Sequence, residues 1–365
     1  FPRVTKPKVV SAFSVDKHGE CHGNLDQLKY LYIPEGDIHW DLNSGYEIYQ
    51  EKSADKRYNN INHILLLIQR DWQQIKIPRH LGDSRSHQRV IFPDFVCFRG
   101  LLRLVMCTPY EARRNNDAWI ILATKYRGTI YLCERDTPEK QDYRVNAPDD
   151  MKKFWYYGYK FEQYIMTKEL NKPNDLTEPV IEAEEMGVAF KAEIDHHRLL
   201  YVAEVDGIKS NVSIDRNADL SKTPVEFVEV KTKKKFEQPN QQRNFRRFTL
   251  RNWWCQSFLA GIGDVYMGVR NAQGIVEAIE KIPVKDMPKA GADSWSTAIC
   301  MKFLIIFLDM VKFYMEDLDD PDTVIKFSFN PQFNDRIEYE KFPGKSPMSF
   351  LPDWYVEFLR LHSSG

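Results

Sequence analysis

The sequence predicts an α+β fold in one large domain, with mixed β-sheets flanked by helices. Segments rich in β-branched and aromatic residues are interspersed with amphipathic helical segments, but without the regular alternation that builds a parallel α/β sheet. No tract rich in Ser, Gly or Pro divides the 365 residues. We therefore expect a single domain over residues 1–365, with its functional core at about 90–285.

The composition is that of an ordinary globular protein with ample material for a core. Hydrophobic residues make up 43% and charged residues 28% of the chain, and 51 basic against 52 acidic residues leave a formal charge of −1. These values exclude a disordered chain and argue against a wholly basic nucleic-acid coat protein. They are compatible with a local basic groove, because binding responds to local fields rather than to the net charge.

Neither a secretory leader nor a membrane span is expected. The most apolar segment, 301–315, is interrupted by Lys302, Asp309 and Lys312 and is better explained as a buried helix. The six cysteines are scattered without a Cys-x-x-Cys pair. This spacing favours reduced thiols in an intracellular compartment and argues against a cysteine-based zinc site.

The first half of the chain is expected to begin irregularly and then to form a helix and a hairpin. Residues 1–60 contain turn-forming clusters and no clear periodicity. An apolar stripe predicts a helix over 58–72. Two segments rich in β-branched and aromatic residues, 118–124 and 129–133, are separated by Tyr126-Arg127-Gly128 and predict a hairpin.

The second half is expected to mix strands and helices. A helix over 151–170 should end before Asn171-Lys172-Pro173, and a helix over 245–260 should end at Gly261 and Gly263. The other predicted elements are strands at 187–194, 199–208, 225–231, 264–270, 274–282 and 323–329 and a helix at 294–317.

Three acids and a lysine form the most informative pattern. Glu204 and Asp206 lie two residues apart in one apolar predicted strand, and Glu229 and Lys231 have the same spacing in the next. Residues two apart in a strand project from the same face. If the two strands pair in one sheet, all four side chains converge on one patch.

Such a group of acids requires a counter-charge, because like charges a few ångström apart repel. Mg²⁺ prefers oxygen ligands and is commonly held by carboxylates, and two such ions can assist phosphodiester cleavage. Lys231 would then orient water or offset charge on the reacting phosphate. Acids followed by Glu-x-Lys are the general outline of the PD-(D/E)xK nucleases.

Each part of this pattern also has an ordinary structural explanation. A single Glu-x-Asp on a strand is usually a solvated face, and Glu193 and Asp195 repeat the spacing eleven residues earlier. We favour Glu204 and Asp206 because their strand is more apolar and is followed by Gly207.

Two further polar residues stand in apolar surroundings. Glu162 lies among aromatic residues in a predicted helix, and Gln256 lies inside an apolar helical segment. Buried groups of this kind need partners. A surface acid and a core-edge glutamine bonded to the backbone remain the alternatives.

Taken together, these segments resemble the eukaryotic decapping exoribonuclease family, whose fungal members partner a nuclear 5′–3′ exonuclease. Each motif is short, but their order and combination are specific, over roughly 90–270. The resemblance rests on Asp94-Phe95-Val96-Cys97-Phe98-Arg99-Gly100, Thr108-Pro109-Tyr110-Glu111, Lys125 to Leu132, Gly158-Tyr159-Lys160-Phe161-Glu162, Glu204-Val205-Asp206, Glu229-Val230-Lys231 and Trp253 to Leu259.

The resemblance implies a PD-(D/E)xK-like catalytic core with the active-site cleft between sheets, and it implies roles for particular residues. Lys231 and Gln256 would touch the scissile phosphate or the attacking water. Arg99 would bind a phosphate near the RNA 5′ end, with Arg127 as a competing candidate. Mg²⁺ or Mn²⁺, two ions per site, would be held by Glu162, Glu204, Asp206, Glu229 and the carbonyl of Val230.

The activity that the resemblance implies is hydrolysis of aberrant RNA 5′ ends, which carry a triphosphate, an unmethylated guanosine cap or an NAD cap. Some members then degrade the exposed RNA in the 5′–3′ direction. The implied partners are single-stranded RNA and a 5′–3′ exonuclease, with a monomeric chain located in the nucleus and also in the cytoplasm. The alternatives are a non-catalytic RNA-binding scaffold or activator of that exonuclease, and a DNA nuclease.

Two other features have open interpretations. Residues 231–251 carry eight basic residues against Glu237, with phenylalanines interleaved. They are typical of an RNA-binding groove wall, of a nuclear-localisation signal, or of an ordinary charged loop. The pair His196-His197 is expected to form a turn without a metal-binding role.

Overall fold

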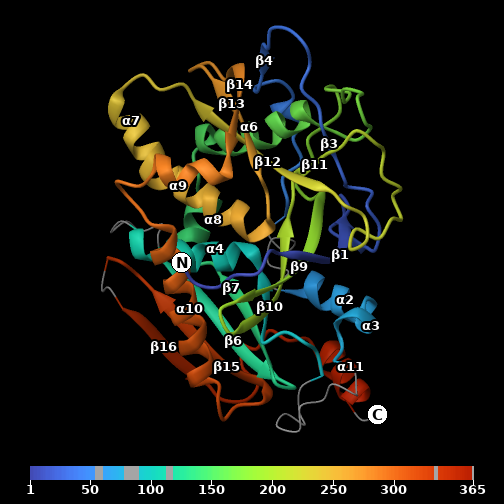
Figure 1. Cartoon of the computed structure of the whole chain (residues 1–365), viewed down its shortest axis with the longest axis vertical. Coiled ribbons are helices and arrows are strands. Elements are labelled where there is room, and N and C mark those ends of the chain that lie inside the picture. Colours follow the sequence, from blue (N-terminus) through green and yellow to red (C-terminus); the bar gives the residue numbers. More distant parts are fainter. Residues whose placement is uncertain (54–60, 78–89, 112–117, 333–335, 364–365) are drawn as a thin grey trace.

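Two mixed β-sheets and the helices packed on them form the α+β architecture expected from the sequence (Figure 1). The computed structural model describes residues 1–53, 61–77, 90–111, 118–332 and 336–363. Within these residues, the larger sheet has nine strands and the smaller sheet has seven.

The larger sheet contains the predicted hairpin and most of the long strands. Strand β5 pairs in parallel with both of its neighbours, and the other pairs are antiparallel. Its order is β16 (Ile337–Phe342), β15 (Asp320–Phe329), β6 (Trp119–Tyr126), β7 (Thr129–Arg135), β5 (Phe95–Phe98), β10 (His197–Glu204), β9 (Glu185–Ile194), β1 (Lys8–Val15) and β2 (Cys21–His22).

The smaller sheet is built around β12, which pairs in parallel with β13 and antiparallel with β11. Its order is β4 (Trp40–Asp41), β14 (Ile275–Pro283), β13 (Asp264–Arg270), β12 (Glu226–Lys234), β11 (Gly207–Lys209), β3 (Tyr30–Leu31) and β8 (Met166–Thr167).

Helices cover both faces of the larger sheet. Helices α2 (Asn62–Arg70) and α11 (Asp353–Ser363) pack on one face. Helices α4 (Arg99–Cys107), α8 (Leu250–Ala260) and α10 (Thr297–Tyr314) pack on the other, and their apolar cluster continues into β12 and β13 of the smaller sheet. Alternate residues of β10 face the two clusters, as the period of a strand requires.

Helix α6 (Asp149–Ile165) covers the smaller sheet. Phe161 packs with Val228, Val230 and Tyr266 of this sheet, and its ring lies where a Cβ on Gly268 would be. The shorter helical segments are η1 (Tyr46–Ile48), α3 (Trp72–Ile75), η3 (Thr108–Tyr110), α5 (Pro138–Val145), α7 (Pro239–Asn244), the π-helical turn η5 (Phe245–Thr249), η6 (Val284–Asp286) and α9 (Met287–Ala290).

The chain crosses from one sheet to the other at residues 205–206. The prediction of a continuous strand over 199–208 was wrong: β10 ends at Glu204, and β11 starts at Gly207 in the other sheet. Gly207 has φ 155°, and a Cβ there would lie 2.5 Å from the carbonyl oxygen of Lys29. Glu204 and Asp206 are therefore neighbours at a crossing, not on one strand face.

Most of the predicted elements are confirmed, with differences at their ends. In the hairpin, Arg127 and Gly128 have φ of 52° and 71°, the left-handed values of a two-residue turn. Helix α6 ends at Ile165, because the next two residues form β8 beside β3. The description of 1–60 as irregular was wrong for Lys8–Val15, which pairs along β9.

The predicted absence of a spanning helix agrees with the structure. In the described residues, no helix is both long enough and apolar enough to cross a membrane. Helix α10, the most apolar segment, instead buries Leu304, Phe307 and Leu308 in the core.

We predict that Gly207→Ala destabilises the fold by about 1–3 kcal/mol, because the new Cβ meets a backbone carbonyl at a φ that side chains rarely adopt. Urea unfolding would measure the loss. The matched control is Gly263→Ala, whose Cβ has nothing within 4 Å. Equal stability of the two variants would contradict the prediction.

Candidate active site

Six parts of the fold meet near the sheet crossing and bring the predicted polar residues together. They are α6 (Glu162), the end of β10 (Glu204), the crossing itself (Asp206), β12 (Glu229, Val230, Lys231), the start of α4 (Arg99) and the middle of α8 (Gln256). The acids thus come from both sheets and a helix. The condition considered from the sequence, that the two strands pair in one sheet, is not met, since β10 and β12 belong to different sheets.

Glu229 is the centre of the group. Its side chain is 1% exposed, and its Oε1 accepts hydrogen bonds from the ammonium of Lys231 and, at 2.7 Å, from Nε2 of Gln256. Hydrogen bonds from a charged donor are the strong kind that a buried carboxylate needs. The shared face of Glu229 and Lys231, expected from their spacing, is confirmed.

The second oxygen of Glu229 is less well satisfied. Among the described residues, neither Oε2 of Glu229 nor Nη1 of Arg99 has a hydrogen-bond partner, although both are buried. The two atoms lie 3.6 Å apart. Buried polar atoms normally have partners, so this pair marks a place where another polar group can be accommodated.

Asp206 joins the sheet crossing to β12. Its Oδ2 accepts a hydrogen bond of 2.6 Å from the backbone N–H of Val230. Burial and the charge of Glu229 raise the pKa of Asp206 well above its ordinary value, against the opposing effect of Lys231. Added positive charge near Asp206 would therefore stabilise its ionised form.

Glu162 is held by a residue that the sequence did not single out. Nζ of Lys29 lies 2.7 Å from Oε1 of Glu162. Burial works against the Lys29 charge, but the carboxylates of Glu162, Glu184 and Asp206 outweigh it and raise the pKa of this lysine. Lys29 lies in the segment that was read as irregular, where no local pattern marked it.

Glu204 lines a cavity of about 540 Å³ beside the crossing. Its side chain is exposed to the cavity, but partial desolvation by the cavity walls, together with Glu185 and Glu162, raises its pKa to about 8. Glu185 is in turn paired with Lys52. The cavity is also lined by Tyr49, Glu51, Lys140, Tyr143, Arg144, Lys152, Trp155, Tyr159 and Glu182.

The four acids are electrostatic neighbours rather than a closed ligand cage. In the described part of the chain, two other groups place three ligand atoms within 4.8 Å of one another, and neither contains these acids. Burial is the main cause of the raised pKa values of Glu204 and Asp206, and repulsion by neighbouring acids adds to it: Glu185 and Glu162 for Glu204, Glu229 and Glu162 for Asp206. Lys29 and Lys231 offset part of this charge, and a divalent ion would offset more.

The competing candidates lie elsewhere. Glu193 and Asp195 are exposed at the opposite end of the β9–β10 hairpin, because Glu193 pairs with Arg198 whereas Glu204 pairs with Gly187. Arg127 lies in the turn between β6 and β7.

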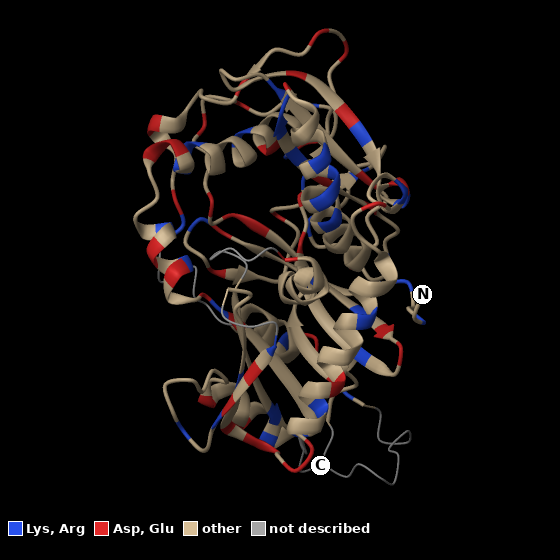
Figure 2. Cartoon of the chain, turned by 90° about the vertical axis from the view of Figure 1, so that its left-hand side faces the viewer, with Lys and Arg blue, Asp and Glu red and all other residues tan. Residues whose placement is uncertain are grey.

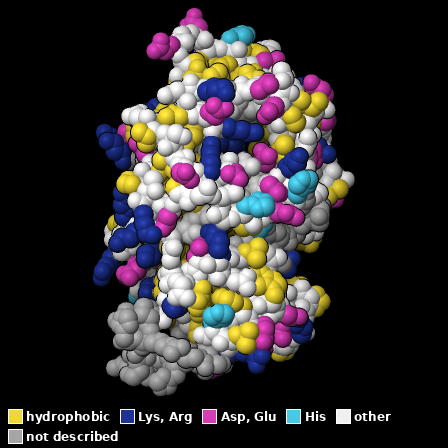
Figure 3. Space-filling model, turned by 90° about the vertical axis from the view of Figure 1, so that its right-hand side faces the viewer, with side chains coloured by type: hydrophobic (Ala, Val, Ile, Leu, Met, Phe, Trp, Pro, Cys, Tyr) yellow, Lys and Arg dark blue, Asp and Glu magenta, His cyan; other side chains and the backbone are white. Residues whose placement is uncertain are grey.

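The basic segment 231–251 has more than one role. In Figure 2, Lys and Arg residues gather on the helical segment formed by α7, η5 and α8. A cavity of about 570 Å³ on this segment is lined by Lys233, Lys234, Lys235, Phe236, Phe245 and Phe248 among others. Figure 3 shows the opposite face, where acidic and basic side chains are mixed over most of the surface.

Several of these basic residues have partners within the protein. Lys231 pairs with Glu229, and Nζ of Lys234 lies 2.9 Å from Oε1 of Glu237. Nζ of Lys233 lies over the ring of Phe236 and 4.6 Å from the centre of the Phe245 ring. Arg251 is 1% exposed and binds Glu111 at 2.7 Å and the carbonyl of Tyr110 at 3.1 Å. Arg251 therefore anchors α8 to the η3 segment.

Comparison with known families matches nearly the whole chain. A family model described as RAI1 like PD-(D/E)XK nuclease covers residues 5–356. A decapping and exoribonuclease protein of Xenopus laevis is 30% identical over 364 residues, which are 98% of this chain and 86% of that protein. Decapping and exoribonuclease protein Rai1 of Drosophila melanogaster is 29% identical over 100% of this chain and 94% of its own.

Solved structures share the fold at lower sequence identity. Candida albicans Rai1, in complex with pU5 and Mn²⁺, has a TM-score of 0.78 at 16% identity and covers 99% of this chain and 97% of its own. Scheffersomyces stipitis Rai1, in complex with (3'-NADP)+ and a calcium ion, has a TM-score of 0.79 at 18% identity with the same coverage.

We predict that stability in EDTA depends on pH through Glu204. Its pKa in the folded state, about 8, lies above the value of 4.5 for a free carboxyl, so its contribution is lost as the pH rises toward 8. Glu204→Gln should remove this loss. The melting temperature of the variant, relative to that of the wild type, should therefore increase from pH 5 to pH 8. Added Mn²⁺ should stabilise the wild type more than the variant.

Differential scanning fluorimetry at several pH values measures both effects. The control is Glu193→Gln, an exposed glutamate at the other end of the same hairpin. Parallel pH profiles for all three proteins would contradict the prediction.

Proposed function

The chain belongs to the family of RAI1-like PD-(D/E)XK nucleases, and on that premise we propose that it is a metal-dependent hydrolase of RNA 5′ ends. One observation carries the proposal: the buried carboxylate of Glu229 is held by Lys231 and Gln256, while its free oxygen faces Arg99. The substrates are RNAs with a 5′-triphosphate, an unmethylated guanosine cap or an NAD cap. Degradation of the exposed RNA in the 5′–3′ direction follows.

The relatives support this reaction class. Those at about 30% identity over almost the whole chain are named decapping and exoribonuclease proteins. Structural neighbours have been solved with pU5 and Mn²⁺ and with 3'-FADP. RNA with a reactive 5′ end is therefore the substrate class that we assign to the crossing between the sheets.

The side chains present fit divalent ions that prefer oxygen. Four carboxylates surround the crossing, two of them have raised pKa values, and Oε2 of Glu229 is a buried acceptor without a hydrogen bond among the described residues. We assign two ions, Mg²⁺ or Mn²⁺, to Glu162, Glu204, Asp206, Glu229 and the carbonyl of Val230. When bound, the ions supply positive charge that neutralises phosphate oxygens and lowers the pKa of water.

Lys29 sets a condition on this arrangement. The ammonium of Lys29 lies 2.7 Å from Oε1 of Glu162, so an ion binds Glu162 either through Oε2 or after Lys29 has released Oε1. Lys29 is also within electrostatic reach of Asp206. It therefore balances the acids before the ions arrive and would move toward the phosphate oxygens afterwards.

The remaining groups act on the phosphate and the water. Although burial works against its charge, Glu229 and Asp206 raise the pKa of Lys231, so it is an ammonium that donates to a developing negative oxygen. The amide of Gln256, held by Glu229, orients the water or the phosphate. Nη1 of Arg99 is the free donor that binds a phosphate oxygen at the 5′ end.

The groove on 233–249 extends the proposed RNA path. Lys234 and Lys235 neutralise phosphates, and Phe236, Phe245 and Phe248 offer rings on which bases stack. The nuclear location, the monomeric state, the exonuclease partner and the catalytic core at 90–285 remain predictions. An RNA-binding scaffold without activity, or a DNA nuclease, is an outcome that the tests below would reveal.

We predict that Glu229→Gln lowers kcat about 100-fold or more, because it removes the charge that pairs with Lys231 and binds the ion while keeping the shape. The assay follows release of the 5′ group from labelled triphosphate, guanosine-capped, NAD-capped and monophosphate RNAs with Mn²⁺. EDTA should abolish release. The matched control, Glu193→Gln, should retain activity, because that exposed glutamate lies outside the site.

Two results would decide against the proposal. Metal-independent release, or full activity of Glu229→Gln, would remove the assigned chemistry. Absence of any product from all four RNAs, with RNA binding intact, would favour the scaffold, and faster cleavage of duplex DNA would favour the DNA nuclease.

We further predict that Lys234→Gln combined with Lys235→Gln weakens binding of single-stranded RNA longer than the active site. The slope of log affinity against log salt should become shallower by about 1.4, because two phosphate contacts are lost. Hydrolysis of a capped dinucleotide should not change. The control combines Lys302→Gln on α10 with Lys341→Gln on β16, both exposed. An equal effect of this control on RNA affinity would disprove RNA binding in the groove.

A further inference from the structure

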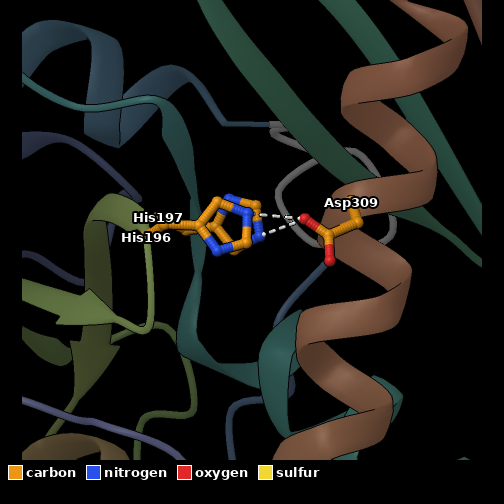
Figure 4. A group of neighbouring side chains, drawn as sticks. All are labelled: His196, His197 and Asp309. Carbon is orange, nitrogen blue, oxygen red and sulfur yellow. Dashed lines mark hydrogen bonds and ion pairs between the residues drawn. The ribbon is translucent and has the colours of Figure 1, made fainter.

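A cluster outside the active site combines two histidines and an aspartate. His196 and His197 occupy the turn between β9 and β10, where Asp195 has a left-handed φ of 55°. Both rings point toward Asp309 on α10 (Figure 4). Oδ1 of Asp309 lies 2.7 Å from Nε2 of His196 and 3.0 Å from Nε2 of His197.

His197 lacks the hydrogen bonds that its burial requires. Its side chain is 0% exposed, and neither ring nitrogen makes a hydrogen bond of good geometry to any described residue. A neutral imidazole has one donor and one acceptor, and leaving them unsatisfied is costly. His197 thus has a buried ring nitrogen that makes no hydrogen bond and is directed into the cluster.

His196 is oriented as metal-binding histidines usually are. Its Nδ1 lies 3.1 Å from Oδ2 of Asp195, which leaves Nε2 directed at Asp309. A carboxylate behind the ring selects the tautomer whose Nε2 lone pair is free for a metal. At 2.7 Å from a carboxylate oxygen of Asp309, Nε2 acts as a donor, so an incoming ion would displace its proton.

We propose that His196, His197 and Asp309 bind one divalent transition-metal ion of the zinc class, with water as the fourth ligand. Two imidazoles and a carboxylate are a ligand set typical of zinc, whereas Mg²⁺ and Mn²⁺ prefer all-oxygen sites. Zinc bonds of about 2.0–2.1 Å place tetrahedral ligand atoms about 3.3 Å apart. The observed contacts of 2.7 and 3.0 Å need to open by only a few tenths of an ångström.

The surrounding charges allow the added ion. Lys312 is the nearby cation that opposes it, but its Nζ lies 3.7 Å from Asp94, which Arg198 also contacts at 3.2 Å. Three acids, Asp94, Asp195 and Asp309, therefore face two cations around the cluster. A second group, Asp16, Glu20 and His22, offers similar spacing, but there Asp16 is already bonded to two backbone N–H groups and to His22.

The site would join a turn of the larger sheet to α10. It lies at the opposite end of β9 and β10 from Glu204, so it is separate from the active site. The sequence around the histidine pair carries no metal-binding pattern, and Asp309, the third ligand, is 113 residues away from His196. The ion acts as a staple, because it binds the folded arrangement and not the unfolded chain.

Titration of the full chain with Co²⁺, in the presence of excess Mg²⁺ to occupy oxygen sites, tests the proposal. We expect one equivalent with the visible absorption of a low-coordinate cobalt–imidazole site, displaced by Zn²⁺. Asp309→Asn and His196→Asn should each weaken binding at least about tenfold. The control His22→Asn, in the second group, and Glu229→Gln, in the active site, should leave the signal unchanged.

His196 is exposed, so His196→Asn tests the ligand even if Asp309→Asn alters the fold. Thermal unfolding in EDTA checks that each variant is folded, and added Zn²⁺ should raise the melting temperature of the wild type more than that of either variant. Unchanged Co²⁺ affinity in both Asp309→Asn and His196→Asn would contradict the proposed site. So would a cobalt signal that Mg²⁺ or Glu229→Gln abolishes.

Discussion

The buried negative charge of Glu229 is the constraint on which the catalytic region depends. A carboxylate that is 1% exposed is tolerated only with charged and polar groups around it: Lys231 and Gln256 donate hydrogen bonds, and Arg99 adds its positive charge at 3.6 Å. They come from β12, α8 and α4, so satisfying one side chain fixes the relative positions of three elements. The same arrangement leaves one carboxylate oxygen and one guanidinium nitrogen available for a ligand.

The second requirement is the crossing between the sheets at residues 205–206. Because β10 and β11 belong to different sheets, the chain must turn sharply, and Gly207 permits the close approach to the Lys29 carbonyl. The turn brings Asp206 onto the backbone N–H of Val230. Lys29, which directly precedes β3 of the smaller sheet, supplies charge to Glu162. The crossing at residues 205–206 therefore determines both the local backbone geometry and the positions of the charges that balance one another.

Residues of the same chemical type have different roles in this protein, depending on how deeply they are buried and on their neighbours. Within the basic segment, Arg251 is buried and anchors α8, whereas Lys234 and Lys235 are more accessible at the groove. Along the β9–β10 hairpin, one end carries carboxylates suited to hard cations, and the other carries imidazoles suited to softer ones. The composition alone cannot distinguish the roles of these residues, whereas their exposure and their neighbours in the structure can.

The sequence by itself determined the local features: the hairpin with Arg127-Gly128 at its turn, the helix carrying Glu162, the end of α8 at Gly261, and Glu229 beside Lys231 on one strand face. These depend on periods of two or 3.6 residues and on glycine conformations, which neighbours in the chain dictate. Only the tertiary structure decided that β1 is a buried strand, that Glu204 and Asp206 flank a crossing, and that Lys29 reaches Glu162. Pairs such as Lys29 and Glu162, 133 residues apart, meet through packing of whole elements, which no local spacing encodes.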